Sequence, residues 1–557
     1  MKKILCLTLA IAMLFTLAAC GGGGTATQAP SVAIPSADMP TNYNPAPTGS
    51  GSSKAPETGA PADEGPQYGG VVRFIDTGTN GGTAEPFGFV WTPMVAKHYS
   101  TPWSEALVNF TQDGVYEPHL AYDWDVDQEA KTITFYLREG IEFTDGSPFN
   151  AEAVAWNINR WPEDGRGNEE ITYAEATGEY EVVIHYINWQ NVLFETFASH
   201  SYSMVSMQNF LDHDKDYAMQ HPVGTGPFIL SEWVPGSHIK FVRNENYWQE
   251  GKPYLDGVEY YEITDVMTQI ATIVAETSDA VDYFATANAE QAHTLMSQAK
   301  DFDCSYMRGG GTMTLCPSSD NPDSPLYDLK VRQAIAYAID REAIVEAKGF
   351  GIFKPAYQIT NEGYSGHLPD DNPNIIKYDP EYAKQLLTEA GYPNGLTLTI
   401  YSPMTFQDVI VIIQDQLSEI GITCELEFPE AGRINDLNYH GWEGLLAVNF
   451  GQVMNTGISY YIWYHPDQDS YVSAYRPPEY EDMYYTARRS FDIDDELFGA
   501  LGNLVLEYMT FIPIYHSATV YFARNGLMNH GAYAYSSDTM WTPWDAYWAA
   551  GSPQLTR

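Results

Sequence analysis

Residues 328–428 alternate between helix-like and strand-like segments with short joints, and this alternation restricts the fold more than any other feature of the chain. The clearest helix begins at Asp379-Pro380, where a capping side chain precedes a proline at the first helical position, and it stops at Gly391. Its apolar face carries Ala383, Leu386, Leu387 and Ala390. A helix over 407–420 is flanked by predicted strands over 396–401 and 422–428. This order of elements predicts α/β architecture.

Capping residues mark further helices. Asp328 is expected to cap a helix whose apolar positions recur every three to four residues, and Asp340 to cap a shorter helix after it. In the N-terminal half, Asn150 is expected to cap a helix that runs through 154–158. Strands are predicted over 68–75, 132–138 and 180–187. Both halves of the chain therefore mix helices with strands.

The chain is too long for one core. Its 557 residues exceed the ~250–300 residues at which a single hydrophobic core stops growing, so two or three lobes are expected. Apolar residues make up 44% of the chain and charged residues 18%, which is typical of globular proteins. The 40 tyrosines suit a binding surface or, equally, a tyrosine-rich fold surface.

The net charge excludes one class of partner. At −45, the chain repels a phosphate backbone, so nucleic-acid binding is not expected. The charge indicates solubility first and, more weakly, a preference for neutral or cationic ligands.

The first twenty residues predict export. Two lysines precede an apolar run over 4–17 that is too short for a transmembrane helix. The run ends in Leu17-Ala18-Ala19-Cys20, which resembles the bacterial lipobox, and the resemblance implies acylation of Cys20. A plain secretory signal with a stray cysteine is the alternative. We therefore expect a lipoprotein signal peptide over 1–19 and a mature chain that is lipid-anchored on the extracytoplasmic face of the bacterial cell membrane.

Residues 20–66 are rich in Gly, Pro, Ala, Ser and Thr and have almost no large apolar residues. Such a segment cannot bury enough surface to offset the entropy of ordering, so it is predicted to be a disordered linker between the lipid and the folded chain. Three cysteines follow it, namely Cys304, Cys316 and Cys424. A disulfide between Cys304 and Cys316 is chemically permitted outside the cytoplasm, and unpaired buried cysteines are the alternative.

Catalytic and metal-binding motifs are missing from the sequence. HExxH, GxSxG and Walker A patterns do not occur. A segment from Asp123 begins like a calcium loop but has Gln128 in place of the glycine and Thr134 in place of the glutamate. His213 and His221 come nearest to a metal-binding pair and lack cysteine or acidic partners. No enzyme activity, cofactor or metal site is expected, and a triad assembled from distant residues stays open as an alternative.

Four stretches, in order along residues 68–550, carry a family resemblance. They are 117–152, with Leu137-Arg138-Glu139-Gly140 and Asp145-Gly146; Gly224-Thr225-Gly226-Pro227-Phe228 with 243–256; 331–341, which begins Val331-Arg332-Gln333-Ala334; and 378–392 with Ile420-Gly421-Ile422. Together they resemble the bacterial extracellular solute-binding proteins of family 5, which serve peptide, oligopeptide and nickel ABC importers. Structural roles are expected for them: Gly146 permits a positive φ at a bend, Gly224 and Gly226 let the backbone turn, and Arg332 forms ion pairs near the interdomain region.

The resemblance implies an α/β, two-lobed periplasmic-binding-protein-like fold of type II, from the large cluster with an extra subdomain in lobe one. Lobe one would combine residues 67–103, 222–302 and 520–557, with 104–221 as the appended subdomain and 303–519 as lobe two. Crossings near 302 and 519 would form the hinge. The chain would be a monomer that closes its lobes on a solute and delivers the solute to ABC importer permease subunits.

The family resemblance implies a peptide as the first choice of ligand. One departure of this sequence from the family pattern favours a neutral solute, such as an oligosaccharide, as the alternative. The family's peptide binders hold the peptide's amino end with an aspartate of lobe two, whereas the corresponding stretch here, 449–455, contains no acid. Its Asn449, Gln452 and Asn455 suit hydroxyl or amide groups, or else satisfy backbone groups only.

Further ligand contacts are expected beside the cleft. Asn80 and Glu85 follow the first strand, where open α/β sheets tend to bind ligands. The other candidates are Trp103, Arg308, Trp541 and Trp544. Two other classes of function stay open. A secreted hydrolase would need a nucleophile or paired carboxylates in the cleft, and a sensor or adhesion lipoprotein would bind another protein.

Overall fold

The structure is a computed structural model that describes residues 65–76, 97–110, 116–163, 167–191, 193–199, 202–275, 281–307, 311–451, 464, 470–491, 493–530 and 543–556. All of these lie within Gly59–Arg557, which forms one compact unit. The predictions for residues 1–64, including the signal peptide, Cys20 and most of the linker, lie outside the described residues. In the described part of the chain, no helix is long and apolar enough to cross a membrane.

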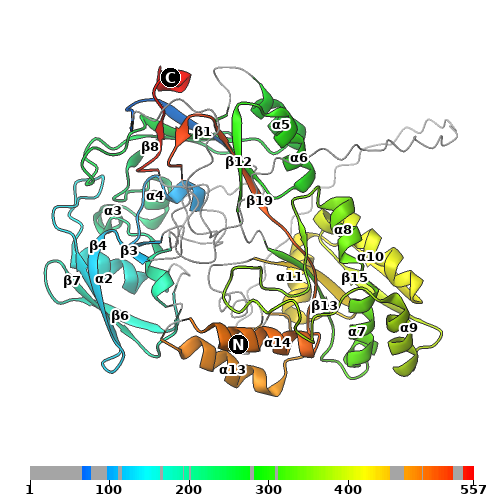
Figure 1. The fold of residues 1–557 in the computed structure, drawn as a ribbon. Coiled ribbons are helices and arrows are strands. Elements are labelled where there is room, and N and C mark those ends of the chain that lie inside the picture. The colour runs from blue at the N-terminus through cyan, green and yellow to red at the C-terminus, as the bar shows by residue number, and fades with distance from the viewer. Residues whose placement is uncertain are drawn as a thin grey trace, which may run out of the picture. The chain divides into compact units, whose positions relative to one another are not determined.

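One sheet gathers seven strands from distant parts of the sequence, in the order β12-β19-β11-β1-β10-β9-β8 (Figure 1). The strands are β1 (Val71–Asp76), β8 (Phe228–Val234), β9 (His238–Arg243), β10 (Gly257–Glu262), β11 (Tyr283–Thr286), β12 (Phe302–Met307) and β19 (Thr519–Arg524). β1 runs parallel to β10 and β11, and β19 runs antiparallel to β11 and β12. Apolar residues of α5 (Val266–Val274) and α6 (Ala289–Gln298) form a core with β11 and β19.

A second sheet has six strands in the order β14-β18-β13-β17-β15-β16. The strands are β13 (Thr312–Pro317), β14 (Lys354–Pro355), β15 (Leu396–Tyr401), β16 (Ile422–Glu427), β17 (Leu445–Phe450) and β18 (Ile512–His516). Side chains alternate between faces along a strand, so the burial of all six residues of β13 means that both faces of the sheet are covered there.

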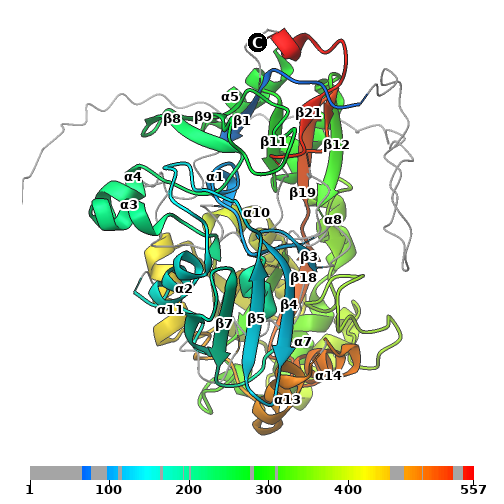
Figure 2. The same ribbon diagram turned by 90° about the vertical axis from the view of Figure 1, so that its left-hand side faces the viewer.

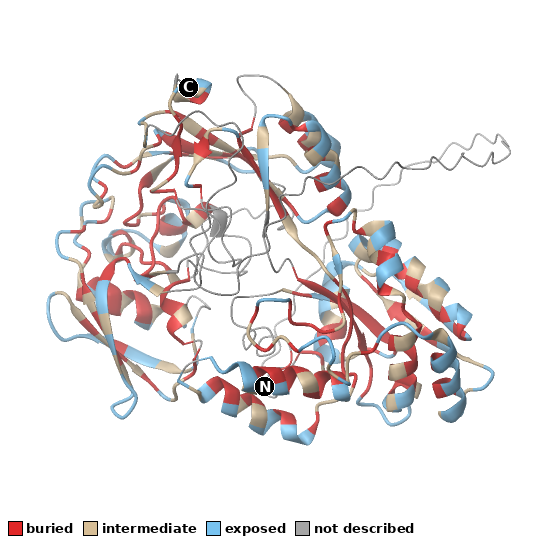
Figure 3. Cartoon of the chain, in the orientation of Figure 1, coloured by how far each residue is buried: buried red, intermediate tan, exposed pale blue. Residues whose placement is uncertain are grey.

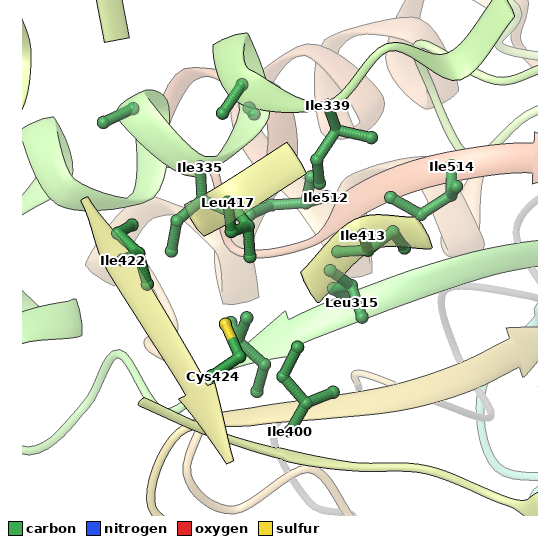
Figure 4. Close-up of a cluster of buried hydrophobic side chains, with 14 of the residues drawn as sticks. Leu315, Ile335, Ile339, Ile400, Ile413, Leu417, Ile422, Cys424, Ile512 and Ile514 are labelled. Carbon is green, nitrogen blue, oxygen red and sulfur yellow. The ribbon is translucent and has the colours of Figure 1, made fainter. Parts of the chain in front are cut away.

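Helices cover the two faces of the six-stranded sheet. On one face lie α7 (Leu329–Ala338), α8 (Arg341–Lys348), α9 (Pro380–Glu389) and α10 (Gln407–Glu419). Figure 4 shows this core, where Ile413 of α10 lies beside Leu315 of β13 and Ile335 of α7 faces the same cluster. The other face packs against α11 (Ala431–His440), α13 (Pro478–Arg489) and α14 (Asp495–Glu507).

A four-stranded antiparallel sheet has the order β4-β5-β7-β6 (Figure 2). Its strands are β4 (Ala121–Asp127), β5 (Thr132–Leu137), β6 (Ile171–Ala176) and β7 (Glu181–Tyr186), and α2 (Ala151–Arg160) packs against β6 and β7. Burial alternates along β5 and β7, with Ile133, Phe135, Val182 and Ile184 inside. The helix α2, which packs on this sheet, is largely buried (Figure 3). The sheet therefore has one buried and one wetter face, as is common for antiparallel sheets.

Short elements complete the described chain. They are α1 (Lys97–Ser100), β2 (Val108–Phe110), β3 (Tyr116–Pro118), α3 (Met207–Asp212), α4 (Lys215–Gln220), β20 (Leu527–Met528), β21 (Tyr547–Trp548) and the 3-10 helices Phe194–Phe197, Pro325–Tyr327, Met404–Phe406 and Pro553–Thr556.

The predicted helix caps are confirmed. Asn150 accepts a hydrogen bond from the Ala153 amide at 3.0 Å. The side chains of Asp328, Asp340 and Asp379 likewise accept from the amides of Lys330, Ala343 and Tyr382. Each bond satisfies a donor that the first turn of the helix leaves without an intrahelical partner.

One expectation for a single residue is corrected, and one open question about two cysteines is answered. Arg332 was expected in ion pairs, but it is 3% exposed and its guanidinium donates to the carbonyls of Leu326, Tyr327 and Tyr508. Burial lowers its pKa to about 10. Cys304 and Cys316 are not disulfide-bonded: both are free, and they lie in different sheets, on β12 and β13.

Gly224 and Gly226, which were expected to let the backbone turn, have a more specific structural role. A side chain at Gly224 would overlap the carbonyl oxygen of Trp103, and one at Gly226 would lie 2.5 Å from the carbonyl carbon of the same residue. The Gly226 amide donates to that oxygen at 3.0 Å. The two glycines therefore permit close approach of two backbone segments.

Candidate functional site

The chain crosses between the two large sheets at two short connections. β12 ends at Met307 in the seven-stranded sheet and β13 begins at Thr312 in the six-stranded sheet, while β18 ends at His516 and β19 begins at Thr519. A hinge needs a few residues at the ends of elements that absorb changes in φ and ψ. Both connections have this form.

The two crossings are bonded to each other. The backbone amide of Ser517 donates to the Gly311 carbonyl at 2.8 Å, and the Ser517 hydroxyl donates to the same oxygen at 3.1 Å. The two crossings therefore lie side by side and share a hydrogen-bond acceptor.

A polar cluster secures the start of β13 beside the crossings. The Thr312 hydroxyl donates to the Ile359 carbonyl at 2.8 Å and lies 2.8 Å from Nδ1 of His516. Burial of the His516 ring, with smaller contributions from the charges of His367 and Lys354, lowers its pKa to about 3. His516 is therefore neutral at physiological pH, and its role in this cluster is hydrogen bonding.

Asn449 lies at the carboxyl end of β17, directly against the first crossing. It is exposed and pairs with Met313 in the sheet register. A Cβ atom at Gly311 would lie 2.5 Å from the Asn449 side-chain nitrogen, and Gly311 has a φ of +113°. Glycine at 311 thus leaves the space that the Asn449 amide occupies. Of the three predicted ligand contacts that the structure describes, Trp103, Asn449 and Trp544, it is Asn449 that lies beside the crossings.

The carboxyl ends of neighbouring strands define where a ligand would lie. β15, β16 and β17 run parallel and end at Tyr401, Glu427 and Phe450. In the other large sheet, β1 ends at Asp76. Ligands of open α/β sheets bind beyond such ends. The segments that follow β1 and β17 carry four predicted contacts, Asn80, Glu85, Gln452 and Asn455, which lie outside the described residues, as do Arg308 and Trp541.

Trp103 and Trp544, two of the predicted ligand contacts, are buried. Trp103 is 4% exposed in the core of the seven-stranded sheet. Trp544 is 7% exposed, and its ring centroid lies 5.2 Å from that of His119. His119 in turn contacts the buried Glu105 carboxylate at 3.0 Å. Ligand contact by either tryptophan stays a prediction.

Sequence reasoning missed the contacts that tie the crossings together. Ser517, Thr312 and His516 belong to no recognised motif, and their partners lie as far as 206 residues away in the chain. The one local signal was the run Gly309-Gly310-Gly311, which predicts unusual backbone geometry. Among the described residues, no group of three or more His, Cys, Asp or Glu side chains is placed to hold a metal ion.

Two α/β sheets that are covered by helices and joined by paired crossings define the two-lobed fold of type II periplasmic binding proteins. Solved structures show the same fold. The ABC transporter-associated periplasmic binding protein DppA from Helicobacter pylori, in complex with the peptide STSA, matches with a TM-score of 0.72 and 19% identity, over 87% of this chain and 99% of that one. NikA from Brucella suis, in complex with Fe(III)-EDTA, matches with a TM-score of 0.73 and 20% identity, over 85% and 99%.

The family follows from sequence comparison. Residues 115–471 match the model of the bacterial extracellular solute-binding proteins, family 5 Middle, and the chain belongs to this family. Among its relatives, the glutathione-binding protein GsiB of Salmonella typhi is 29% identical over 376 residues, which cover 64% of this chain and 70% of the relative. The family resemblance seen in the sequence motifs is thereby confirmed.

Proposed function

We propose that this solute-binding protein captures a small peptide between two lobes and delivers it to the permease of an ABC importer. The observation that carries the proposal is the pair of crossings tied by Ser517 and Gly311, with the exposed Asn449 amide beside them. Closure on a solute at this hinge requires that the closed form bind the solute better than the open form.

The sheet topology supports the proposed division into lobes. Most strands of the seven-stranded sheet come from 67–103, 222–302 and 520–557, the exceptions being β12, which runs on to Met307, and the first residue of β19, Thr519; the six-stranded sheet lies within 303–519. The four-stranded sheet lies within 104–221, the proposed appended subdomain. The boundary at 302 falls at the start of β12, which pairs with β19, so we place the first crossing at 308–311 instead.

A peptide ligand is supported by the relatives. GsiB is named for glutathione binding, and DppA was solved with the peptide STSA. NikA was solved with Fe(III)-EDTA, so this fold also accepts ligands of other chemistry. The neutral amide of Asn449, at the start of the stretch 449–455 in which the resemblance places an acid in peptide binders, favours a neutral polar solute such as an oligosaccharide as the second candidate.

We also propose that the mature chain begins at Cys20, carries lipid there and acts as a monomer on the outer face of the cell membrane. The lipobox-like Leu17-Ala18-Ala19-Cys20 supports the anchor. The mass of the N-terminal peptide from membrane-purified protein tests it. Acyl chains on Cys20 are expected, and a Cys20→Ser chain should leave the membrane fraction. An unmodified N-terminus on the wild-type chain would contradict the proposal.

A thermal-shift panel of peptides, oligosaccharides and metal complexes tests the ligand, after native mass spectrometry has identified any copurified solute. At about 100 times its dissociation constant, a ligand adds roughly 2.7 kcal/mol to the free energy of unfolding. The proposal expects stabilisation by peptides and no product on long incubation. Stabilisation by sugars alone would favour the second candidate, and product formation would show a hydrolase.

A further inference from the structure

The 187–191 loop, which follows β7 of the four-stranded sheet, contacts the C-terminal end of α13, which packs on the six-stranded sheet. Both views place the end of the four-stranded sheet near α13 (Figures 1 and 2). About 300 residues separate the two segments along the chain, as in the pair Trp189 and Ser490 at 301. The contact therefore joins two units that the proposed function requires to move relative to each other.

The loop donates hydrogen bonds to backbone carbonyls at the end of α13. The Asn191 amide donates to the Arg488 carbonyl at 2.8 Å, and its side-chain nitrogen donates to the Ala487 carbonyl at 2.8 Å and the Ser490 hydroxyl at 3.2 Å. The Trp189 indole donates to the carbonyls of Ser490 and Phe491 at 3.2 and 3.3 Å. The last carbonyls of a helix have no intrahelical donors, so the loop supplies what the helix end lacks.

Side chains extend the same contact. The Trp189 ring stacks on Phe491 with centroids 5.3 Å apart and an interplanar angle of 26°. Arg488 donates to the Gln190 side-chain oxygen. Gln190, Asn191 and Arg488 are 9%, 8% and 2% exposed. The polar part of the contact is thus shielded from water. In this low-dielectric environment its hydrogen bonds are stronger than they would be at the surface.

The loop is held in shape from its own side. The two carboxylate oxygens of Glu170 accept from the Gln190 side chain at 2.6 Å and from the Asn188 amide at 3.0 Å. The hydrogen-bond donors of the 187–191 loop are therefore preorganised, which lowers the conformational entropy lost when the loop contacts α13. On separation, water can hydrate the helix-end carbonyls, so the contact can open without leaving backbone groups unsatisfied.

We propose that the 187–191 loop and the end of α13 form a latch that holds the four-stranded sheet against the six-stranded sheet and so favours the closed form before solute binds. The proposal rests on the proposed function only in that the lobes move. Asn191 is its central residue because its backbone and side chain together make three of the hydrogen bonds.

Small-angle X-ray scattering without solute tests the latch. The full chain with Cys20→Ser avoids detergent, and it is compared with the same chain carrying Asn191→Ala or Trp189→Phe. Asn191→Ala removes two hydrogen bonds, while Trp189→Phe removes one N–H that is shared between two carbonyls and keeps a ring to stack on Phe491. The two bonds lost in Asn191→Ala correspond to an increase of about tenfold in the ratio of open to closed molecules. The radius of gyration should rise in both variants.

The matched control is Gln208→Ala, which removes an exposed hydrogen bond to Asp212 in α3, away from the latch. It should leave the radius of gyration unchanged. Circular dichroism melting separates opening from unfolding, since an opened chain keeps its melting transition. If the Asn191→Ala and Trp189→Phe chains are folded and have the radius of gyration of the wild type, the latch proposal is wrong. Because no solute is present, that result would leave peptide capture untouched, whereas a failure to bind any solute would leave the latch standing.

Discussion

The carboxylate of Asp282 lies fully buried and accepts a hydrogen bond from Nε of Arg524 at 3.0 Å. Its second oxygen accepts from the Arg73 amide at 3.1 Å, and Arg524 also donates to the Val281 carbonyl at 2.8 Å. Arg73 belongs to β1 and Arg524 to β19. The pair therefore ties the strand that leaves the second crossing to the first strand of the seven-stranded sheet.

Replacing Asp282 with alanine should destabilise the fold strongly. The substitution leaves the Arg524 guanidinium buried without its counter-ion, which typically costs about 3–5 kcal/mol. Urea unfolding, followed by circular dichroism, measures the change. Glu381→Ala is the control, since it removes an exposed ion pair with Lys384 and should hardly move the midpoint. Equal midpoints for the two variants would contradict the structural role of the buried pair.

Replacing Gly311 with alanine should impair solute binding at the hinge. The residue has a φ of +113°, and the added carbon would lie 2.5 Å from the Asn449 side chain. The backbone conformation alone costs about 1–3 kcal/mol. Gly391→Ala is a matched control because Gly391 also has a positive φ, +92°, with no atom within 4 Å of the added carbon.

Calorimetric titration with a solute that stabilises the protein compares the two glycine variants. Gly311→Ala should bind it more weakly than Gly391→Ala does. Indistinguishable affinities would show that the space beside Asn449 is unimportant for capture.

Stability should fall as the solution is acidified, partly through His516. Its pKa is about 3 in the folded chain against about 6.5 when unfolded. Between these values the unfolded chain takes up a proton that the folded chain refuses, so the free energy of unfolding drops as pH falls from 6.5 toward 3, by up to about 1.4 kcal/mol per pH unit.

The variant His516→Asn removes this titration and keeps a side-chain nitrogen near Thr312. Its melting temperature should decline less steeply between pH 6.5 and 4 than that of the wild type. His530, whose pKa burial lowers to about 4, still contributes to the decline. His213→Asn changes an exposed histidine and should keep the wild-type slope. An unchanged slope in His516→Asn would refute the assignment.

Placing an acid at Asn449 should favour peptides with a free amino end. In Asn449→Asp, a charged hydrogen bond replaces a neutral one, which is expected to tighten binding about tenfold. An N-acetylated version of the same peptide should gain nothing, and Asn246→Asp adds the same charge at an exposed position elsewhere. Equal gains for the free and acetylated peptides would place the amino end away from Asn449.

Local signals predicted the local structure well. The helix expected after Asp379 is α9, Pro380–Glu389, with its cap bond to Tyr382 at 2.9 Å and with Ala383, Leu386 and Leu387 buried. The strands predicted over 396–401 and 422–428 are β15 and β16, the second ending one residue earlier, at Glu427. Caps, helix stops and apolar periodicity act within a few residues, so a sequence states them directly.

Contacts between residues that are far apart in the chain could not be predicted from the sequence. Arg332 was expected to form ion pairs near the interdomain region, yet its guanidinium donates to the Tyr508 carbonyl, which lies 176 residues away in the chain. The Ser517–Gly311 bonds and the contacts of Asn191 with α13 have the same character. Only the folded chain brings such partners together, and nothing in the spacing of the residues marks them.

The central claim is that this family member closes two lobes on a solute. The most direct measurement is the radius of gyration by small-angle X-ray scattering, before and after addition of the solute that gives the largest thermal shift. A smaller radius with solute is predicted, together with one solute bound per chain. The Asn191→Ala chain, whose latch is weakened, should contract at least as much, and an unchanged radius at full occupancy in both chains would contradict closure.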